Sequence, residues 1–181
     1  MKITETNLSG CIIFEPTIFQ DERGYFFESF NTRLFNEAVG QEIKFIQDNQ
    51  SFSKRGVLRG LHFQKGEFSQ AKLVRVIQGK VLDIVVDIRK DSPTFGSHFS
   101  IELSAKNKKQ LFIPRGFAHG FVVLSKEAQF FYKCDNYYNK DSEGGIIYND
   151  QKLSIDWKSE KEDLIISGKD LQLPEFSDCQ F

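Results

Sequence analysis

Residues Ala71–Ile88 read AKLVRVIQGKVLDIVVDI, two short segments rich in β-branched residues that meet at Gly79. Side chains of a strand alternate between its two faces. In the second segment one face is apolar and consists of Leu82, Ile84, Val86 and Ile88, whereas Asp83, Val85 and Asp87 share the other. These carboxylates either meet solvent or line a pocket. Gly79 supplies the positive φ of a two-residue loop, which predicts a hairpin whose strands are antiparallel neighbours.

Short apolar runs broken by Gly, Asn, Asp or Ser continue along the chain, which contains 19 Phe residues. This pattern predicts a mainly β fold, and about ten strands in one domain fit a sandwich or barrel. Besides Ala71–Gln78 and Lys80–Ile88, strands are predicted over Cys11–Phe14, Tyr25–Phe30, Ile43–Ser51, Val57–Phe63, His98–Leu103, Gln110–Ile113, Phe117–Leu124 and Ala128–Cys134.

One helix is predicted over residues 31–40, NTRLFNEAVG. Asn31 or Thr32 can cap its free amides, and Gly40 ends it. Its apolar stripe, which includes Phe35, points to packing rather than chemistry. From Asp141 onward, frequent polar residues between short apolar groups predict turns and short helices that close over the sheet.

The composition indicates a single globular domain and excludes several other classes of protein. A chain of 181 residues with 40% hydrophobic and 27% charged residues fits one globular domain, residues 1–181, and excludes disorder. The formal net charge is -1, so nothing in the balance indicates nucleic acid or an anionic membrane as a partner. Cys11, Cys134 and Cys179 form neither a C-x-x-C pair nor an even set, which favours reduced thiols. The opening MKITETNLSG lacks an apolar signal region, which predicts a soluble, cytoplasmic protein.

The densest group of candidate functional residues lies in Arg55–Gln64, RGVLRGLHFQ, followed by Lys72 in the next strand. Simple alternation places Arg59 and His62 on opposite faces. Gly60 offers a solution, because a glycine inside a strand often marks a bulge that resets the facing.

A second group is Ile113–Phe121, IPRGFAHGF, in which Pro and two Gly surround His119. Pro114–His119 fits the second half of the metal-binding cupin pattern, P-x-G-x-x-H. The first half, H-x-H, is represented only by His62-Phe63-Gln64, so one ligand is missing. Because the chain has 3 His in all, we expect no catalytic metal.

Together these motifs resemble the dTDP-4-dehydrorhamnose 3,5-epimerase family, in order and spacing over nearly the whole chain. The matching segments are Asp21–Phe26, Phe45–Asn49, Gly56–Gln64, Lys72–Val76, Asp87–Arg89, Ser92–Gly96, Ile113–Phe121 and Ser167–Asp170. The resemblance implies a cupin-type jelly roll, or double-stranded β-helix, with a few short helices. It also implies a homodimer, no cofactor, and inversion at C-3 and C-5 of dTDP-4-dehydro-6-deoxy-D-glucose to give the L-rhamnose precursor of cell-surface polysaccharide.

Such a reaction needs a base, a group that stabilises the negative charge on the enolate oxygen, and an acid on the opposite face of the sugar. By resemblance His62 is the base and Asp170 orients it, with Asp83 as an alternative partner. Lys72 would face the enolate oxygen, and Tyr132 would return the proton. Tyr132 shares its strand face with Phe130, which is consistent with an inward position.

The resemblance also implies the residues that bind the nucleotide and sugar. Arg23 and Arg59 match arginines that contact the two phosphates, where a planar guanidinium can donate paired hydrogen bonds. The amino-terminal strand crosses to the partner in the family and would carry Arg23 into the neighbouring site. Further matching positions are Glu28, Gln47, Asp48, Asn49, Lys72, His119, Tyr138, Glu143 and Lys169.

Other functions remain open from the sequence. A related enzyme would invert only one centre, or would isomerise the ketone between C-3 and C-4, with the same base and enolate chemistry. A non-catalytic sugar-binding cupin would keep the arginines without needing His62 or Tyr132. A metal-dependent oxygenase is a third alternative.

Overall fold

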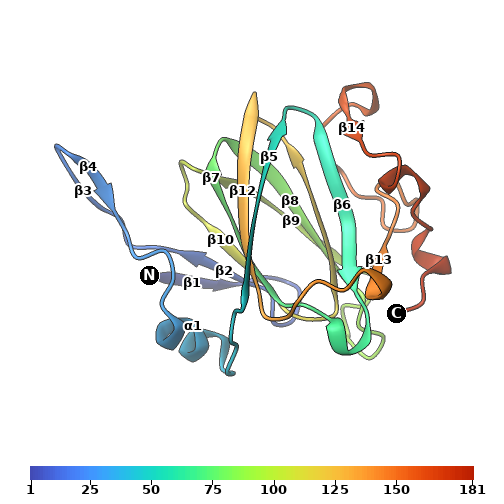
Figure 1. Ribbon diagram of the computed structural model, residues 1–181, viewed down its shortest axis with the longest axis horizontal. Coiled ribbons are helices and arrows are strands. Elements are labelled where there is room, and N and C mark those ends of the chain that lie inside the picture. The colour runs from blue at the N-terminus through green and yellow to red at the C-terminus, as the bar shows by residue number, and fades with distance from the viewer.

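The structure, a computed structural model, describes residues 1–181 and is mainly β, as predicted. Two large sheets make up the body (Figure 1). The first has the order β1 (Lys2–Glu5), β2 (Ile12–Glu15), β10 (Gln110–Ile113), β7 (Lys72–Gln78), β12 (Glu127–Cys134), β5 (Gln47–Lys54). The second has the order β13 (Glu143–Gly145), β6 (Val57–Gln64), β11 (Phe117–Val123), β8 (Lys80–Asp87), β9 (His98–Ser104), and β14 (Ile165–Ile166) pairs in parallel with β6.

The main core lies between the two sheets, because buried side chains of both contribute to one apolar cluster. Phe130 of β12 and Val74 of β7 come from the first sheet, and Val85 of β8 and Phe121 of β11 come from the second. Strand β8 is buried on both faces: Val81 and Val85 face this core. The even positions Leu82, Ile84 and Val86 face a second cluster. The predicted separation of its two faces is confirmed.

The outer faces of both sheets are covered by other segments. The helix α1 (Thr32–Val39) places Phe35 against Phe14 and Phe112 of the first sheet. Asn31 caps it by accepting a hydrogen bond from the Leu34 amide, and Gly40 ends it with φ of 73°, as predicted.

The second sheet is covered by the chain after β13, which includes the buried Trp157 and Phe176. The short helices here are η2 (Lys140–Ser142), η3 (Lys161–Asp163), η4 (Asp170–Gln172) and η5 (Phe176–Asp178), while η1 (Gly66–Phe68) lies between β6 and β7. Turns and short helices were predicted for this part, but β13 and β14 were not. No helix of the fold is long and apolar enough to cross a membrane.

The predicted hairpin at Gly79 is wrong. Strand β7 pairs with β10 and β12, whereas β8 pairs with β9 and β11, so Gly79 carries the chain from one sheet to the other. Its φ is +77°, and a Cβ atom at this position would collide with the carbonyl oxygen of Glu127. The glycine is therefore needed for the turn, but period-two patterning does not distinguish a hairpin from a crossing between facing sheets.

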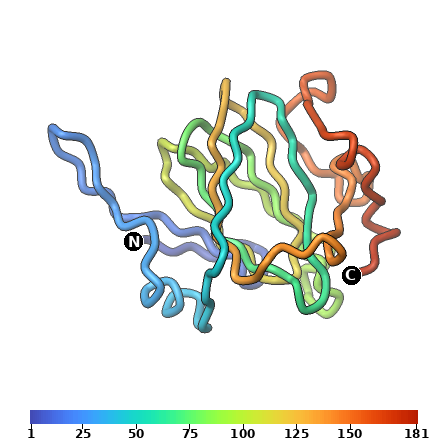
Figure 2. Tube along the Cα trace, in the orientation of Figure 1, coloured from blue at the N-terminus to red at the C-terminus, as the bar shows by residue number.

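A two-stranded arm projects from the body on the side opposite the C-terminal segment (Figures 1 and 2). It consists of β3 (Phe19–Asp21) and β4 (Gly24–Phe26), and both strands are exposed along their length. The strand predicted over Tyr25–Phe30 thus ends early, at Phe26, and the chain from there to α1 is irregular.

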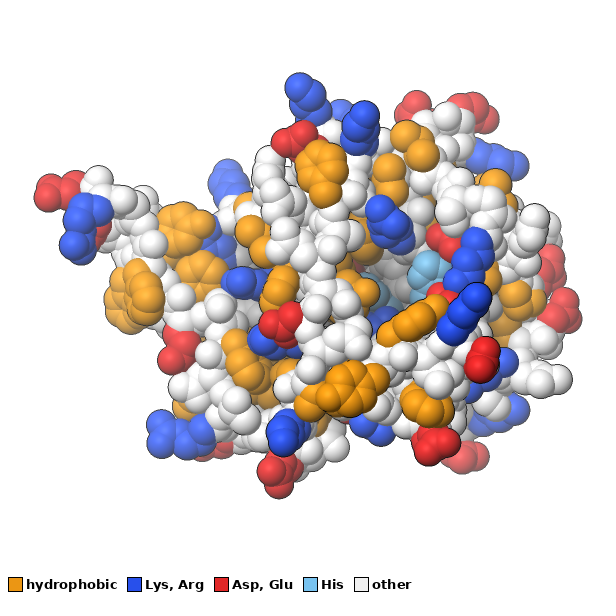
Figure 3. Space-filling model, in the orientation of Figure 1, with side chains coloured by type: hydrophobic (Ala, Val, Ile, Leu, Met, Phe, Trp, Pro, Cys, Tyr) orange, Lys and Arg blue, Asp and Glu red, His pale blue; other side chains and the backbone are white.

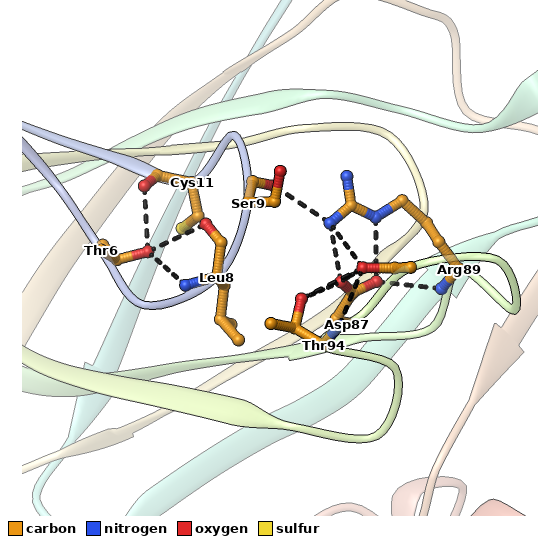
Figure 4. Close-up of polar contacts among 8 residues, drawn as sticks. Thr6, Leu8, Ser9, Cys11, Asp87, Arg89 and Thr94 are labelled. Atoms are coloured by element: carbon orange, nitrogen blue, oxygen red, sulfur yellow. Dashed lines mark hydrogen bonds and ion pairs between the residues drawn. The ribbon is translucent and has the colours of Figure 1, made fainter.

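Asp87, at the end of β8, anchors the loop that follows it (Figure 4). Its carboxylate accepts hydrogen bonds from Arg89 Nε at 2.9 Å, Thr94 Oγ1 at 2.6 Å and the Ser92 hydroxyl. Arg89 also donates to the carbonyl of Ser9, which ties the amino-terminal turn to this loop. Burial raises the pKa of Asp87, but these hydrogen bonds outweigh it and lower the pKa to about 2. Asp87 therefore stays ionised as a structural group.

Candidate active site

A cavity of about 610 Å³ opens between the two sheets, a size within the usual range of small-molecule sites. Strands β5, β7 and β12 contribute from one sheet, and β6 and β11 from the other. The segment from Ile165 to Asp170 closes one side. Figure 3 shows histidine side chains in a hollow of this face, with basic residues around its rim. The predicted site residues that line the cavity are Asn49, Arg59, His62, Lys72, His119, Tyr132, Lys169 and Asp170.

The irregularity expected at Gly60 is confirmed, and it brings Arg59 and His62 into the same cavity. The register between β6 and β11 shifts between the pairs His62↔His119 and Arg59↔Phe121. Gly60 has φ of +128° and lies so close to the backbone of Gly120 that a Cβ atom would not fit. A side chain at this position would therefore change the facing of His62.

His62 is held by a carboxylate from the C-terminal segment. Its Nε2 lies 2.8 Å from Oδ1 of the buried Asp170. The Asp170 amide donates to the Ser167 hydroxyl, and Oδ2 accepts from the Gly60 amide at 3.4 Å. Burial raises the pKa of Asp170, but the hydrogen bond and charge of His62 outweigh it, so the pKa falls below its usual value. With Nε2 directed to this carboxylate, Nδ1 is the nitrogen that can accept a proton from a ligand.

The alternative partner Asp83 lies beside the other histidine of the cavity. Its Oδ2 is 2.9 Å from Nε2 of His119, and both side chains are buried. His119 stacks on Phe130, with ring centroids 5.9 Å apart. His62 and His119 are direct partners across β6 and β11, so each of the two neighbouring histidines that line the cavity is bonded to an aspartate.

Lys72 and Tyr132 come from the first sheet and lie close together, with the ammonium nitrogen 5.9 Å from the centre of the phenol ring. Burial lowers the pKa of Lys72, while nearby Cys134, Asp83 and Glu143 oppose the change. Burial raises the pKa of Tyr132. Tyr132 therefore keeps its proton at neutral pH and can donate it to a strong base.

Arg59 provides a positive charge that is not neutralised by a carboxylate. Its Nε donates to the hydroxyl of Ser53 at 3.1 Å, and the guanidinium makes no ion pair. This single bond orients the group and leaves its terminal nitrogens free for an anion.

Glu143, Tyr138 and Lys169 form a hydrogen-bonded group, of which Lys169 lines the cavity. Oε2 of Glu143 accepts from Lys169 Nζ at 2.7 Å and from the Tyr138 hydroxyl at 2.9 Å. Burial raises the pKa of Glu143, but these two bonds outweigh it and lower the pKa. Gln47 links to the same region, because its side-chain oxygen accepts from the Tyr138 amide and its nitrogen donates to Asn49.

Comparison with known proteins decides the family. The family model described as dTDP-4-dehydrorhamnose 3,5-epimerase matches residues 5–178. The chain belongs to this family. It is therefore an epimerase, which is a class of isomerase, and its fold is the cupin-type jelly roll predicted from the sequence.

Similar proteins match this epimerase along its whole length. The dTDP-4-dehydrorhamnose 3,5-epimerase of Shigella flexneri is 50% identical, with 100% of this chain and 99% of the relative covered. The crystal structure of the enzyme from Elizabethkingia anophelis has a TM-score of 0.97 at 55% identity, covering 100% and 99% of the two chains. The Legionella pneumophila enzyme, in complex with dTDP-4-keto-L-rhamnose, has a TM-score of 0.95 at 46% identity, covering 99% and 94%.

Three predicted binding residues of the epimerase lie away from the cavity of their own chain. Arg23 is at the exposed tip of the arm, where it pairs with Asp21. Glu28 lines a separate cavity of about 170 Å³ beside α1. Asp48 accepts a hydrogen bond from Lys133 at 2.9 Å on the exposed side of β5.

Two serines of the epimerase site were not singled out from the sequence. Ser53 orients Arg59, and Ser167 accepts from the Asp170 amide. Ser53 continues the alternating polar face of Asn49 and Ser51, so its facing was readable. Its contact with Arg59 could not be predicted, because it depends on how strands β5 and β6 lie relative to each other.

Proposed function

We propose that this epimerase inverts C-3 and C-5 of dTDP-4-dehydro-6-deoxy-D-glucose and yields dTDP-4-dehydro-L-rhamnose for dTDP-L-rhamnose biosynthesis. One observation carries the proposal: His62 stands on the second sheet and Tyr132 on the first, and both line the same cavity. A sugar ring between them would meet a base on one face and an acid on the other. The complex of the Legionella enzyme with dTDP-4-keto-L-rhamnose supports the choice of substrate.

His62 is proposed to remove the hydrogens next to the C-4 ketone. These hydrogens are acidic because the carbanion delocalises as an enolate, so an imidazole can serve as the base. Asp170, ionised and 2.8 Å from Nε2, would fix the tautomer and stabilise the imidazolium that forms when Nδ1 takes the proton.

Lys72 is proposed to stabilise the enolate oxygen, and Tyr132 to return a proton from the other wall. An ammonium between two sheets acts in a low-dielectric setting, where its charge is worth more than in water. The phenol of Tyr132, held in its protonated form by burial, is a weak acid, but an enolate is basic enough to take its proton.

The nucleotide is proposed to bind at the basic entrance. Arg59, free of ion pairs, would bind the diphosphate, while Gln47, Asn49 and His119 would contact the thymidine and sugar. Tyr138 could then stack on the base. Glu143 and Lys169 would contact the ligand from the same entrance, as their hydrogen bonds to one another beside Tyr138 support.

We propose a homodimer in which the arm of each protomer reaches the site of the other. Phe19, Tyr25 and Phe26 are exposed on the arm, as expected for a surface that a partner covers. Arg23, at the tip of the arm, would then complete the partner's nucleotide site, while Glu28 and Asp48 remain predicted substrate-binding residues. The enzyme is proposed to act in the cytoplasm as one domain, residues 1–181, without nucleic acid or membrane partners.

Incubation with dTDP-4-dehydro-6-deoxyglucose in deuterated buffer tests the proposed reaction. Because each inversion passes through an enolate that is reprotonated from protein groups in exchange with solvent, we expect deuterium at both C-3 and C-5 of the product. Nuclear magnetic resonance of the product measures the label. Label at one position only would replace the proposal with a single-centre epimerase. No exchange at either position would contradict it and would favour a non-catalytic sugar-binding protein.

A further inference from the structure

Asp83 is a buried charge that the reaction as described does not use. It lies on β8 with its carboxylate between the two sheets, on the same strand face as Val85 of the main core. One oxygen is bonded to His119 Nε2, but the other, Oδ1, is buried and has no hydrogen-bond partner. A buried carboxylate with an unsatisfied oxygen is costly, and such a group needs compensation from a nearby positive charge.

Lys72, like Arg59, is a cation of the cavity that lacks a counterion. Its ammonium lines the cavity and makes no hydrogen bond or ion pair; its contact with the Tyr132 ring is 5.9 Å to the centroid. A buried ammonium in such a setting tends to lose its proton. Stabilisation of an enolate oxygen requires the charged form, so an anion must favour that form.

Cys134, Glu143 and Asp83 can each carry a negative charge that raises the pKa of Lys72. Two of them are unsuitable as its counterion. Burial raises the pKa of Cys134 on β12 to about 11, so its thiol is neutral at physiological pH. Glu143 on β13 already accepts hydrogen bonds from Lys169 and Tyr138. Asp83 on β8 remains, with one free oxygen.

We propose that Asp83 is a positioning residue of this epimerase, which holds His119 through Nε2 and supplies the buried negative charge that keeps Lys72 an ammonium. The proposal rests on the proposed role of Lys72. Burial raises the pKa of Asp83 and lowers that of Lys72. The charge of Lys72 and the hydrogen bond and charge of His119 oppose the shift at Asp83, and the charge of Asp83 opposes the shift at Lys72.

The same carboxylate determines what His119 offers to the sugar. When neutral His119 donates its Nε2 proton to Asp83, Nδ1 is left as an acceptor. An acceptor suits a sugar hydroxyl and not a ketone oxygen. Asp83 would thereby direct the C-4 oxygen to Lys72 and a hydroxyl group to His119.

Asp83→Asn separates the charge from the geometry, because the amide oxygen can still accept from His119. We expect the pKa of Lys72 to fall by about one pH unit, a typical effect of removing one nearby opposite charge. The alkaline limb of the kcat profile should move to lower pH by the same amount, since deprotonation of Lys72 removes the active form. Side-chain magnetic resonance of ligand-free protein, with the signal assigned by Lys72→Arg, measures the first quantity without any substrate.

Asp87→Asn is the matched control. Asp87 is fully buried on the same face of the same strand, but it bonds to Arg89, Ser92 and Thr94 outside the cavity. This variant is expected to lose stability and to keep the wild-type titration of Lys72. In a Lys72→Arg background, Asp83→Asn should no longer move the alkaline limb, because arginine stays charged.

An unchanged Lys72 titration in folded Asp83→Asn would overturn the proposal. If that variant does not fold, the wild-type protein still tests it, because the carboxyl carbon of Asp83 must report an ionised group at pH 7. A protonated Asp83 at that pH would overturn the proposal equally. The Lys72 titration and the ionisation state of Asp83 are both measured without substrate. Their outcomes are therefore independent of the deuterium experiment.

Discussion

Replacement of His62 by alanine is expected to lower kcat by about 10²–10⁴-fold, the usual contribution of a general base. The neighbouring His119, whose Nε2 is bonded to Asp83, is proposed to bind a sugar hydroxyl and not to act as the base. Binding of dTDP should change little, because His62 is proposed to contact the sugar and not the diphosphate. Loss of hydrogen exchange at C-3 and C-5, followed in deuterated buffer, measures the effect.

His98→Ala is the matched control for this variant. His98 is the remaining histidine of the chain and lies on β9, outside the cavity. It should retain wild-type exchange, and both variants should bind dTDP as the wild type does in calorimetry. Wild-type exchange in His62→Ala would show that another residue is the base.

Replacement of Tyr132 by phenylalanine is expected to separate exchange from inversion. The ring would keep its contacts with Phe130 and the Lys72 ammonium and lose only the hydroxyl group. His62 could still remove a hydrogen and return it to the same face, so solvent exchange should continue. Formation of inverted product should fall by about 10²–10⁴-fold, because no acid remains on the opposite wall. Chromatography of the product and magnetic resonance of its label measure the two processes separately.

Tyr148→Phe serves as the control for the loss of a buried hydroxyl. Tyr148 is buried in the cluster between the second sheet and the C-terminal segment, away from the cavity. It should epimerise at the wild-type rate. Inverted product at the wild-type rate in Tyr132→Phe, or loss of exchange together with product, would contradict the division of roles between His62 and Tyr132.

Local chemistry made most of the secondary structure predictable. The helix at residues 32–39 follows from Asn31 as a cap, Phe35 as its buried side chain and Gly40 in the left-handed region. The error at Gly79 concerned pairing, because a glycine turn joins two strands of one sheet or of facing sheets with the same sequence pattern. The short strand β14 was missed because its two residues are stabilised by β6, far away in the sequence.

In the candidate site too, local sequence pattern predicted neighbouring residues but not contacts between distant ones. The sequence placed a cation, an imidazole and a glycine together at Arg59, Gly60 and His62, and in the structure Arg59 and His62 both line the cavity. It left open whether Asp83 or Asp170 meets His62, since both are distant along the chain. The fold places Asp170 there and gives Asp83 to His119. Polar partners that lie 108 and 36 positions apart in the chain cannot be paired by local sequence pattern.

A crystal structure with a dTDP-linked 6-deoxyhexose in the cavity tests the central claim most directly. The account predicts that His62 Nδ1 and the Tyr132 hydroxyl lie on opposite faces of the sugar ring, each within about 3.5 Å of the carbon or proton that it serves. Both groups on one face of the ring, or a sugar bound beyond the reach of either, would contradict it.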